Sequence, residues 1–182
     1  MKDRDWCAKV EAEITSLKER LGKIEGQRPA NCIGKKEVIE ADIVWPEMDI
    51  DGLHFDAVAT HAVFELKEDG KYYSRDILFN SARDTDEGTG RDLLSEYLNS
   101  EAVKKTLTEI LKSVGLLAAV TDVFLPEDNQ GVKKYNGVRW WYWLKPRAAY
   151  SSAHFAGITS SGHAGINSAS AVGGCAPAFC VA

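Results

Sequence analysis

The residues able to do chemistry are few in this chain, and they do not combine into a catalytic motif. The cysteines lack the CxxC spacing of a zinc site and have no histidine pair beside them; they are Cys7, Cys32, Cys175 and Cys180. The histidines are scattered, at His54, His61, His154 and His163. We therefore expect free thiols, as in a reducing compartment, and no catalytic residue, metal ion or cofactor.

Two acidic segments could hold a cation or supply an acid and a base. The segment Asp49–Gly52 begins like a calcium loop, but Leu53 and Thr60 stand where that loop needs further oxygen ligands. The segment Asp84–Gly90 is a glycine-rich turn with three carboxylates. A metal or acid/base site is one interpretation of this turn, and a polar loop that caps the next helix is the favoured one.

A run of four aromatic residues, Trp140–Trp143, could form a stacking platform for a sugar or a base. Alternation along a strand would place Trp140 and Tyr142 on one face and the other two rings on the opposite face. Four large rings on one short strand are more typical of the centre of a core. We expect a core strand, one face of which supports a binding surface.

Strands and helices must position these residues, and the pattern segregates the two, which predicts an α+β fold. A helical period covers 89–117, and Asn99-Ser100 divides it, with Ser100 as the second N-cap. Turns are expected at 68–71 and 160–162. Residue types predict strands at 38–39, 43–45, 57–66, 72–73, 123–125, 138–144, 155–159, 163–167 and 178–181.

An N-terminal helix is predicted over 5–25, within a separate segment, 1–28. Its apolar residues follow the 3-and-4 spacing of a coiled coil: Cys7, Val10, Ile14, Leu17, Leu21 and Ile24. Charged residues surround this narrow stripe, which favours a short coiled-coil stalk that forms a homo-oligomer, dimer or trimer. A helix docked on its own domain is the alternative.

Composition limits the class of protein. The chain has 182 residues and a formal net charge of −5, so a phosphate backbone is a poor candidate partner and no nucleic-acid binding is expected. No apolar run is long enough for a membrane span. The charged start predicts no cleaved signal peptide, and the cellular location stays open.

The last 36 residues, 147–182, differ sharply from the rest. They contain one charged residue, Arg147, and no Lys, Glu, Gln, Met or Trp, although these five types make up a quarter of residues 1–146. Random drawing would place about nine of them in the tail. These five are the amino acids that a codon ending in C cannot encode, and an AAC codon mutated at both adenines reaches the other fifteen. A flexible Ser/Gly tail is the alternative, but recurring apolar residues predict a folded segment.

The order of residues toward the C-terminus resembles that of variable proteins targeted by diversity-generating retroelements of gut bacteria and phages, which have a C-type-lectin-type fold. The resemblance covers roughly 70–182. In the closing segment Gly174–Phe179, Cys175 and Ala176 replace the Val and Arg usual in that family. The other matching segments are Tyr73–Phe79, Arg91–Asn99, Trp140–Leu144 and Ser160–Gly162.

This resemblance implies a C-type-lectin-like domain at 36–182, with two helices and a small antiparallel sheet, and a variable region at about 147–172. Such a protein binds a ligand through side chains that are rewritten by adenine-directed mutagenesis and that project from a fixed scaffold. The calcium-ligating triplets of sugar-binding lectins are absent, so neither calcium nor a carbohydrate is expected. The positions expected to vary are Tyr150, Ser152, His154, Gly157, Thr159, Ser161, His163, Gly165, Ile166, Asn167 and Ser168.

Two other functions stay open at this point. A formylglycine-generating-type enzyme is built on the same general fold and would need Cys175 and Cys180 as reactive thiols. An undiversified phage or bacterial structural protein could carry a similar tip. For the favoured hypothesis, the partner is an unknown protein or cell-surface ligand, met on a virion or on a cell surface that displays the protein through another component.

Overall fold

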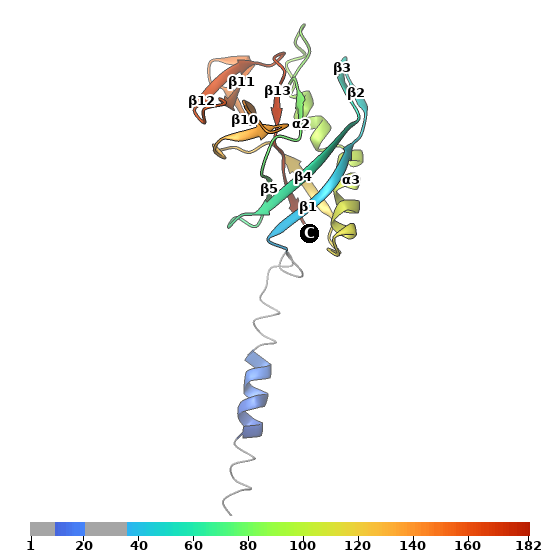
Figure 1. Ribbon diagram of the computed structural model, residues 1–182, viewed down its shortest axis with the longest axis vertical. Helices are drawn as coiled ribbons and strands as arrows, with labels where there is room; N and C mark the ends of the chain where they lie inside the picture. The colour runs from blue at the N-terminus through green and yellow to red at the C-terminus, as the bar shows by residue number, and fades with distance from the viewer. Residues whose placement is uncertain (1–9, 21–35) are drawn as a thin grey trace, which may run out of the picture. The chain divides into compact units, whose positions relative to one another are not determined.

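The computed structural model describes residues 10–20 and 36–182, and the chain divides into two compact units, 1–35 and 36–182 (Figure 1). In the first unit, residues 10–20 are α-helical, and the predicted seam residues Ile14 and Leu17 are exposed. The predicted seam residues Cys7, Leu21 and Ile24 lie outside the described residues. No helix in the described part of the chain is long and apolar enough to cross a membrane.

The second unit contains two five-stranded sheets, and the first of them holds the last strand of the chain in its interior. Its order is β1-β4-β5-β14-β7, with every neighbour antiparallel. Alternate residues of β1 face inward, so that Ile39, Ile43 and Trp45 are buried. The strands are β1 Val38–Trp45, β4 Val58–Leu66, β5 Tyr72–Ser74, β14 Ala178–Val181 and β7 Val120–Phe124.

The second sheet has the order β12-β11-β10-β13-β6, and only the β10–β13 pair is parallel. Strand β12 therefore forms one edge of this sheet. The strands are β6 Phe79–Ser81, β10 Tyr142–Ala148, β11 Ser151–Ile158, β12 Ala164–Ser168 and β13 Gly173–Cys175. The C-terminal segment from 147 onward is thus folded, as the apolar residues in it predict.

Two small hairpins complete the strands: β2 (Met48–Ile50) with β3 (Leu53–Phe55), and β8 (Lys133–Tyr135) with β9 (Val138–Trp140). The β2–β3 turn is Asp51-Gly52, and both residues have the positive φ that a two-residue hairpin turn requires. The segment that begins like a calcium loop is therefore part of a hairpin, and the described residues contain no cluster suited to a metal ion.

Two helices, α2 (Leu93–Leu98) and α3 (Glu101–Ser113), follow strand β6 in the chain. The Ser100 hydroxyl accepts a hydrogen bond from the Val103 N–H, which confirms the predicted N-cap. Asp84–Gly90 is a polar loop, as the favoured interpretation has it, but it does not cap the next helix. The side chain of Asp92, which lies outside this loop, caps α2.

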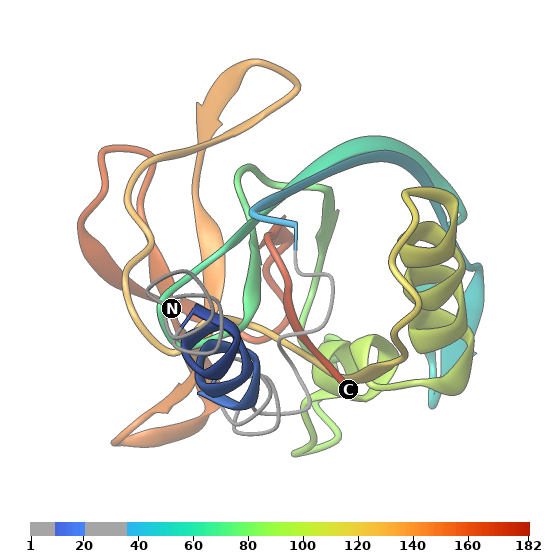
Figure 2. The ribbon, with the colours of Figure 1, turned by 90° about the horizontal axis from the view of Figure 1, so that it is seen from below.

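The core lies where α3, the inner face of the first sheet and the start of the second sheet meet. Helix α3 packs on β1 and β7, and both views place it on the opposite side of the domain from β10–β12 (Figures 1 and 2). One continuous cluster joins these parts, with buried aromatic rings that include Trp45, Phe64, Phe79, Tyr97, Trp143, Phe155 and Phe179. The fold is α+β and mostly sheet, as the segregated pattern predicts.

The predicted strand 138–144 is interrupted at Trp141, which corrects the expected alternation of its rings. Tyr142 and Trp143 are fully buried, whereas Trp140 is 41% exposed at the end of β9. The Trp141 ring covers Gly173, where a Cβ atom would lie only 2.3 Å from ring carbon Cη2. The backbone carbonyl of Trp141 accepts the Gly174 N–H. Trp141 therefore contacts strand β13 at the point where the predicted strand is interrupted.

Candidate ligand-binding surface

The residues expected to vary all lie on the hairpin β11–β12 or on the turns at its ends. Tyr150 occupies the two-residue turn between β10 and β11 and is 76% exposed. Strand β11 carries Ser152, His154 and Gly157. The β11–β12 turn and the strand that follows it carry the others, Thr159, Ser161, His163, Gly165, Ile166, Asn167 and Ser168.

The strand register divides these residues between two faces of the hairpin. His154 lies opposite Ser168, and Ile166 lies opposite Ala156, so these residues share one face. Gly157 pairs with Gly165, and Asn167 pairs with the buried Phe155, on the other face. Ser168 and Ile166 are exposed, and Asn167 is half-buried. The candidate surface therefore wraps around the sheet edge formed by β12 and is not one flat patch.

Gly157 does not fit the expectation of an exposed, variable position. It is buried, and a Cβ atom there would lie 2.9 Å from the carbonyl oxygen of Tyr142. Gly165 differs, because a Cβ atom there would meet only Thr159 Cγ2, at 3.4 Å. We therefore leave Gly157 out of the candidate surface and keep Gly165.

At one end of the hairpin, small polar side chains hold the β11–β12 turn together. Thr159 Oγ1 lies 3.1 Å from Ser161 Oγ, which lies 3.1 Å from His163 Nδ1. Thr159 Oγ1 also accepts the His163 N–H, at 3.1 Å. The Asn129 amide donates to the carbonyl of Gly162, at 2.9 Å, so a loop from outside the hairpin supports the turn. The hydroxyl and imidazole groups at this tip are exposed and can form hydrogen bonds with a ligand.

At the other end, a hollow of about 290 Å³ separates the hairpin from the loop 84–90. Ser152 and Ser168 line it on the hairpin side, and Asp86 and Glu87 line it on the loop side. Nearby, Ser151 Oγ lies 2.8 Å from His154 Nδ1. The hollow therefore places two positions expected to vary opposite carboxylates of a fixed loop.

The acidic loop itself is organised by Asp84. Its buried carboxylate accepts hydrogen bonds from the Thr89 hydroxyl and from three backbone N–H groups, those of Thr85, Thr89 and Gly90. Burial opposes the ionisation of Asp84, but these hydrogen bonds outweigh it and hold its pKa below the usual range. This carboxylate has a structural role, so Asp86 and Glu87 are the other carboxylates that the loop supplies to the hollow.

Arg83 is the important residue that sequence reasoning missed. Its fully buried guanidinium donates to both carboxylate oxygens of Asp92 and to the carbonyls of Leu144 and Lys145. It also lies over the Phe155 ring, 3.9 Å from the centroid. Arg83 thus ties helix α2 to strand β10, which leads into residues 147–172. A single arginine beside an acidic loop carries no signal of this role.

Arg147 fixes the backbone at the start of β11. Its guanidinium donates to the carbonyl of Ser152, at 2.5 Å, and to that of Gly90, at 3.0 Å. It lies 4.7 Å from the centroid of the Phe155 ring, which therefore contacts two guanidinium groups. The one charged side chain in the C-terminal segment therefore anchors the start of the hairpin.

The two thiols in the described part of the chain are free, and both are shielded. Cys175 is fully buried, and burial raises its pKa well above the usual range. Burial also raises the pKa of the half-buried Cys180. A high pKa keeps the thiolate scarce at neutral pH, which makes both thiols weak nucleophiles.

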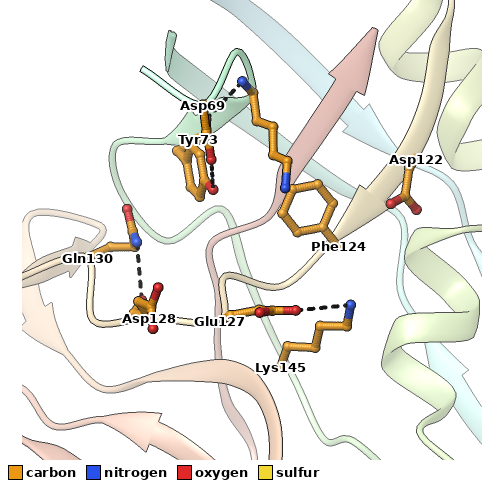
Figure 3. A pocket seen from close by; sticks show the side chains of 9 residues that line it. Asp69, Tyr73, Asp122, Phe124, Glu127, Asp128, Gln130 and Lys145 are labelled. Carbon is orange, nitrogen blue, oxygen red and sulfur yellow. Dashed lines mark hydrogen bonds and ion pairs between the residues drawn. The ribbon is translucent and has the colours of Figure 1, made fainter. Parts of the chain in front are cut away.

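A separate hollow of about 210 Å³ lies beside β5 and β7 (Figure 3). Two pairs of its polar side chains contact one another: the Tyr73 hydroxyl donates to Asp69, at 2.6 Å, and Lys145 Nζ lies 3.5 Å from Glu127. Lys71 Nζ lies over the Phe124 ring, 5.1 Å from its centroid. None of the residues around it belongs to 147–172, so this hollow is not part of the candidate surface.

Comparison of the chain with protein-family models, with curated proteins and with solved structures gave no match. The assignment of a function therefore rests on the residues of this chain.

Proposed function

We propose that this chain is a ligand-binding protein whose β11–β12 hairpin is diversified by a retroelement through adenine-directed mutagenesis. The observation that carries the proposal is a coincidence of composition and position. The stretch that lacks Lys, Glu, Gln, Met and Trp contains the exposed hairpin and the turns at its ends. A codon-limited segment that folds into an exposed edge of a sheet is what a rewritable binding surface requires.

The scaffold around the hairpin supports this proposal. Trp143 in the neighbouring strand β10 and Phe155 within β11 are fully buried. Arg83 donates to backbone carbonyls of β10, and Arg147 donates to the carbonyl of Ser152 at the start of β11 and to that of Gly90. Backbone contacts do not depend on which side chains the exposed positions carry. Replacing those side chains therefore changes what the surface binds while leaving the fold in place.

We assign the second unit to the C-type-lectin-like folds on the same basis. The two helices agree with the arrangement that the resemblance implies, and two five-stranded sheets, one of them with a parallel pair, take the place of the small antiparallel sheet expected. Tyr150, His154, His163 and Asn167 give the surface aromatic bulk and adaptable hydrogen bonding, as in antibody paratopes. Ile166 adds an apolar contact. The ligand is a protein or another component of a cell surface.

The N-terminal helix adds valency in this proposal. Exposed Ile14 and Leu17 lie at seam positions of the predicted heptad pattern, so several copies would present their hairpins together. Linking weak sites raises the overall affinity through effective concentration, without any new contact at each site.

The protein-level test replaces seven positions of the candidate surface at once, six exposed and one half-buried (His154), with residues that a codon ending in C can encode. The positions are Tyr150, Ser152, His154, Ser161, His163, Ile166 and Ser168. Surface substitutions lie within about ±0.5 kcal/mol and differ in sign, so the seven together are expected to cost about 1 kcal/mol and to lower the melting temperature by only a few degrees. Phe155→Ala is the matched control and is expected to cost about 3–5 kcal/mol. If the seven-position variant unfolds like the control, the surface is not interchangeable and the proposal fails.

The gene-level test reads the flanking DNA. The proposal expects a near-identical template repeat beside a reverse transcriptase gene, differing from this 3′ end only at template adenines. Uniform drift across all codons in sibling genomes would instead support an undiversified structural protein. Rapid titration of Cys175 and Cys180 in the folded protein would support the formylglycine-generating-type enzyme.

A further inference from the structure

Strand β4 has a partner along only part of one of its edges. It pairs with β1 from Val58 to Glu65, but with β5 only from Phe64 to Leu66. After Arg75 the chain leaves β4: the Ile77 N–H donates to the Lys134 carbonyl in β8, and the Leu78 N–H donates to the Cys175 carbonyl in the second sheet. The β4 edge near 58–61 therefore faces the segment 76–78 and the β8–β9 hairpin across a hollow.

The backbone groups that point into this gap can be identified from the hydrogen-bond parity. The Val63 carbonyl accepts the Arg75 N–H, and the Lys67 N–H donates to the Lys71 carbonyl. The backbone N–H and C=O groups of odd-numbered residues in this segment therefore point toward the β5 side. Leu66 donates to Glu37, so even-numbered residues point toward β1. Within the described residues, the N–H and C=O groups of Ala59 and His61 on the β5 side have no strand partner.

A hollow of about 410 Å³ lies against this unpaired edge. The buried side chains of Ile77 and Leu78 and the half-buried Tyr135 line it. Its volume falls within the range of about 300–1,000 Å³ that is usual for ligand sites. The edge also lacks the prolines that commonly block strand addition, since residues 58–62 read Val-Ala-Thr-His-Ala. Its one ionisable side chain, His61, pairs with Glu40 and Asp42 of β1.

We propose that this edge binds an extended segment of another polypeptide, which adds to β4 as a short strand. The unpaired groups of Ala59 and His61 repeat at the two-residue spacing of a strand, about 6.8 Å, and a peptide backbone presents donors and acceptors at the same repeat. Side chains on one face of the added strand would contact Ile77, Leu78 and Tyr135, so apolar residues are preferred there. This proposal is independent of the diversified surface, because no residue of 147–172 takes part.

The test uses the full chain labelled with ¹⁵N and the uncharged peptide acetyl-Thr-Val-Thr-Val-Thr-amide. Binding is expected to shift the amide signals of Ala59 and His61. At a free peptide concentration ten times Kd, exchange of these two amides with solvent is expected to slow about tenfold. The same peptide with N-methyl groups at alternate residues is the control, because it cannot donate to the edge.

Two variants separate the backbone contact from a change of side chain. Ala59→Pro removes the N–H that points into the hollow and no ladder bond to β1, whereas Ala59→Val keeps that N–H. The proline variant is expected to bind the peptide about fivefold more weakly, and the valine variant to bind it as the parent does. Should Ala59→Pro fail to fold, the N-methylated peptide still decides the question. Absence of shifts at Ala59 and His61, or equal binding of both peptides, would overturn the proposal.

Discussion

At the scale of single residues, the hairpin is held by groups that contact backbone or aromatic rings and leave the exposed side chains free. Arg83 donates to two carbonyls and to Asp92, and Arg147 donates to two others. The Trp143 indole donates to the carbonyl of Ser81, at 2.9 Å. These contacts are indifferent to the identity of neighbouring side chains, which separates support of the hairpin from binding.

The two glycines that pair across the hairpin are expected to differ in tolerance. Gly157→Ala should lower the free energy of unfolding by about 1–3 kcal/mol, because its Cβ atom would press on the carbonyl oxygen of Tyr142. Gly165→Ala should change it by less than about 1 kcal/mol, because the nearest atom is a methyl group at 3.4 Å. Urea denaturation of both variants measures the difference. Equal losses would show that the two positions are equally open.

Asp92 is expected to contribute stability that depends on pH. Burial opposes its ionisation, but hydrogen bonds and charge attraction from Arg83 outweigh this, so its folded pKa lies below the usual value. Its contribution is therefore present above the unfolded pKa, about 4, and is lost as the pH falls through the folded pKa. Asp92→Asn should cost about 3 kcal/mol at pH 7, because it leaves the buried Arg83 without a counter-charge.

Chemical denaturation from pH 7 to pH 2 measures this effect. The difference between the parent and Asp92→Asn should shrink below pH 4. The matched control is Asp86→Asn, since Asp86 is exposed in the neighbouring loop and its loss should have little effect at any pH. A constant difference across the whole range would contradict the role given to the Asp92 carboxylate.

Lys133 is expected to have a pH dependence of the same sign as that of Asp92, but in an alkaline range. Its ammonium group is buried and donates to the carbonyls of Ser74, at 2.7 Å, and Arg75, at 2.9 Å. Burial lowers its pKa from 10.5 to about 8. Between these two pH values the unfolded chain binds more protons than the folded protein, so this group's contribution to stability rises with pH.

Comparison with Lys133→Met isolates this contribution from other titrating groups. Relative to that variant, the parent should gain about 2 kcal/mol of unfolding free energy between pH 7 and pH 9.5. Lys134→Met, at the exposed neighbouring position, should show no such change. Parallel curves for the parent and Lys133→Met would show that the folded pKa of Lys133 is not lowered.

At the scale of elements, local signals predicted most of what the structure contains. The turn 160–162 lies between strands that residue types predict, and Ser100 caps α3 through its own hydroxyl. The break at Trp141 and the burial of Gly157 could not be predicted from local sequence, because they involve contacts with Gly173 and Tyr142 respectively. Those contacts depend on which strands become neighbours, and a residue pattern along one strand does not encode that.

The N-terminal helix gives a prediction at this scale. Leu17→Lys would place a charge in the predicted seam and should convert an oligomer of the full chain into a monomer. Ala12→Lys places the same charge on the opposite face of the heptad and should leave the oligomer intact. Sedimentation velocity of the parent and both variants measures the mass. A monomeric parent would remove the stalk from the proposed function.

At the scale of the whole molecule, the two sheets keep two surfaces apart. The β11–β12 hairpin forms one edge of the second sheet, and the open edge of β4 belongs to the first. The codon-limited composition set the C-terminal segment apart, and its recurring apolar residues predicted that it is folded. Neither signal gave any indication of the β4 edge, which exists because the chain leaves the first sheet after Arg75. The sequence thus pointed to the candidate binding residues but did not predict the two sheets that separate them from the β4 edge.

The position of β14 limits which variants of the gene can yield a folded protein. This strand lies between β5 and β7, and the buried Phe179 ring contacts Tyr72 and Phe64. Any stop codon or frameshift within the codons for 147–172 deletes or scrambles β14 and splits the first sheet. Under the proposed diversification, changes at exposed positions upstream of β14 leave the fold in place, whereas truncated or frame-shifted products do not fold and are left for proteases to remove.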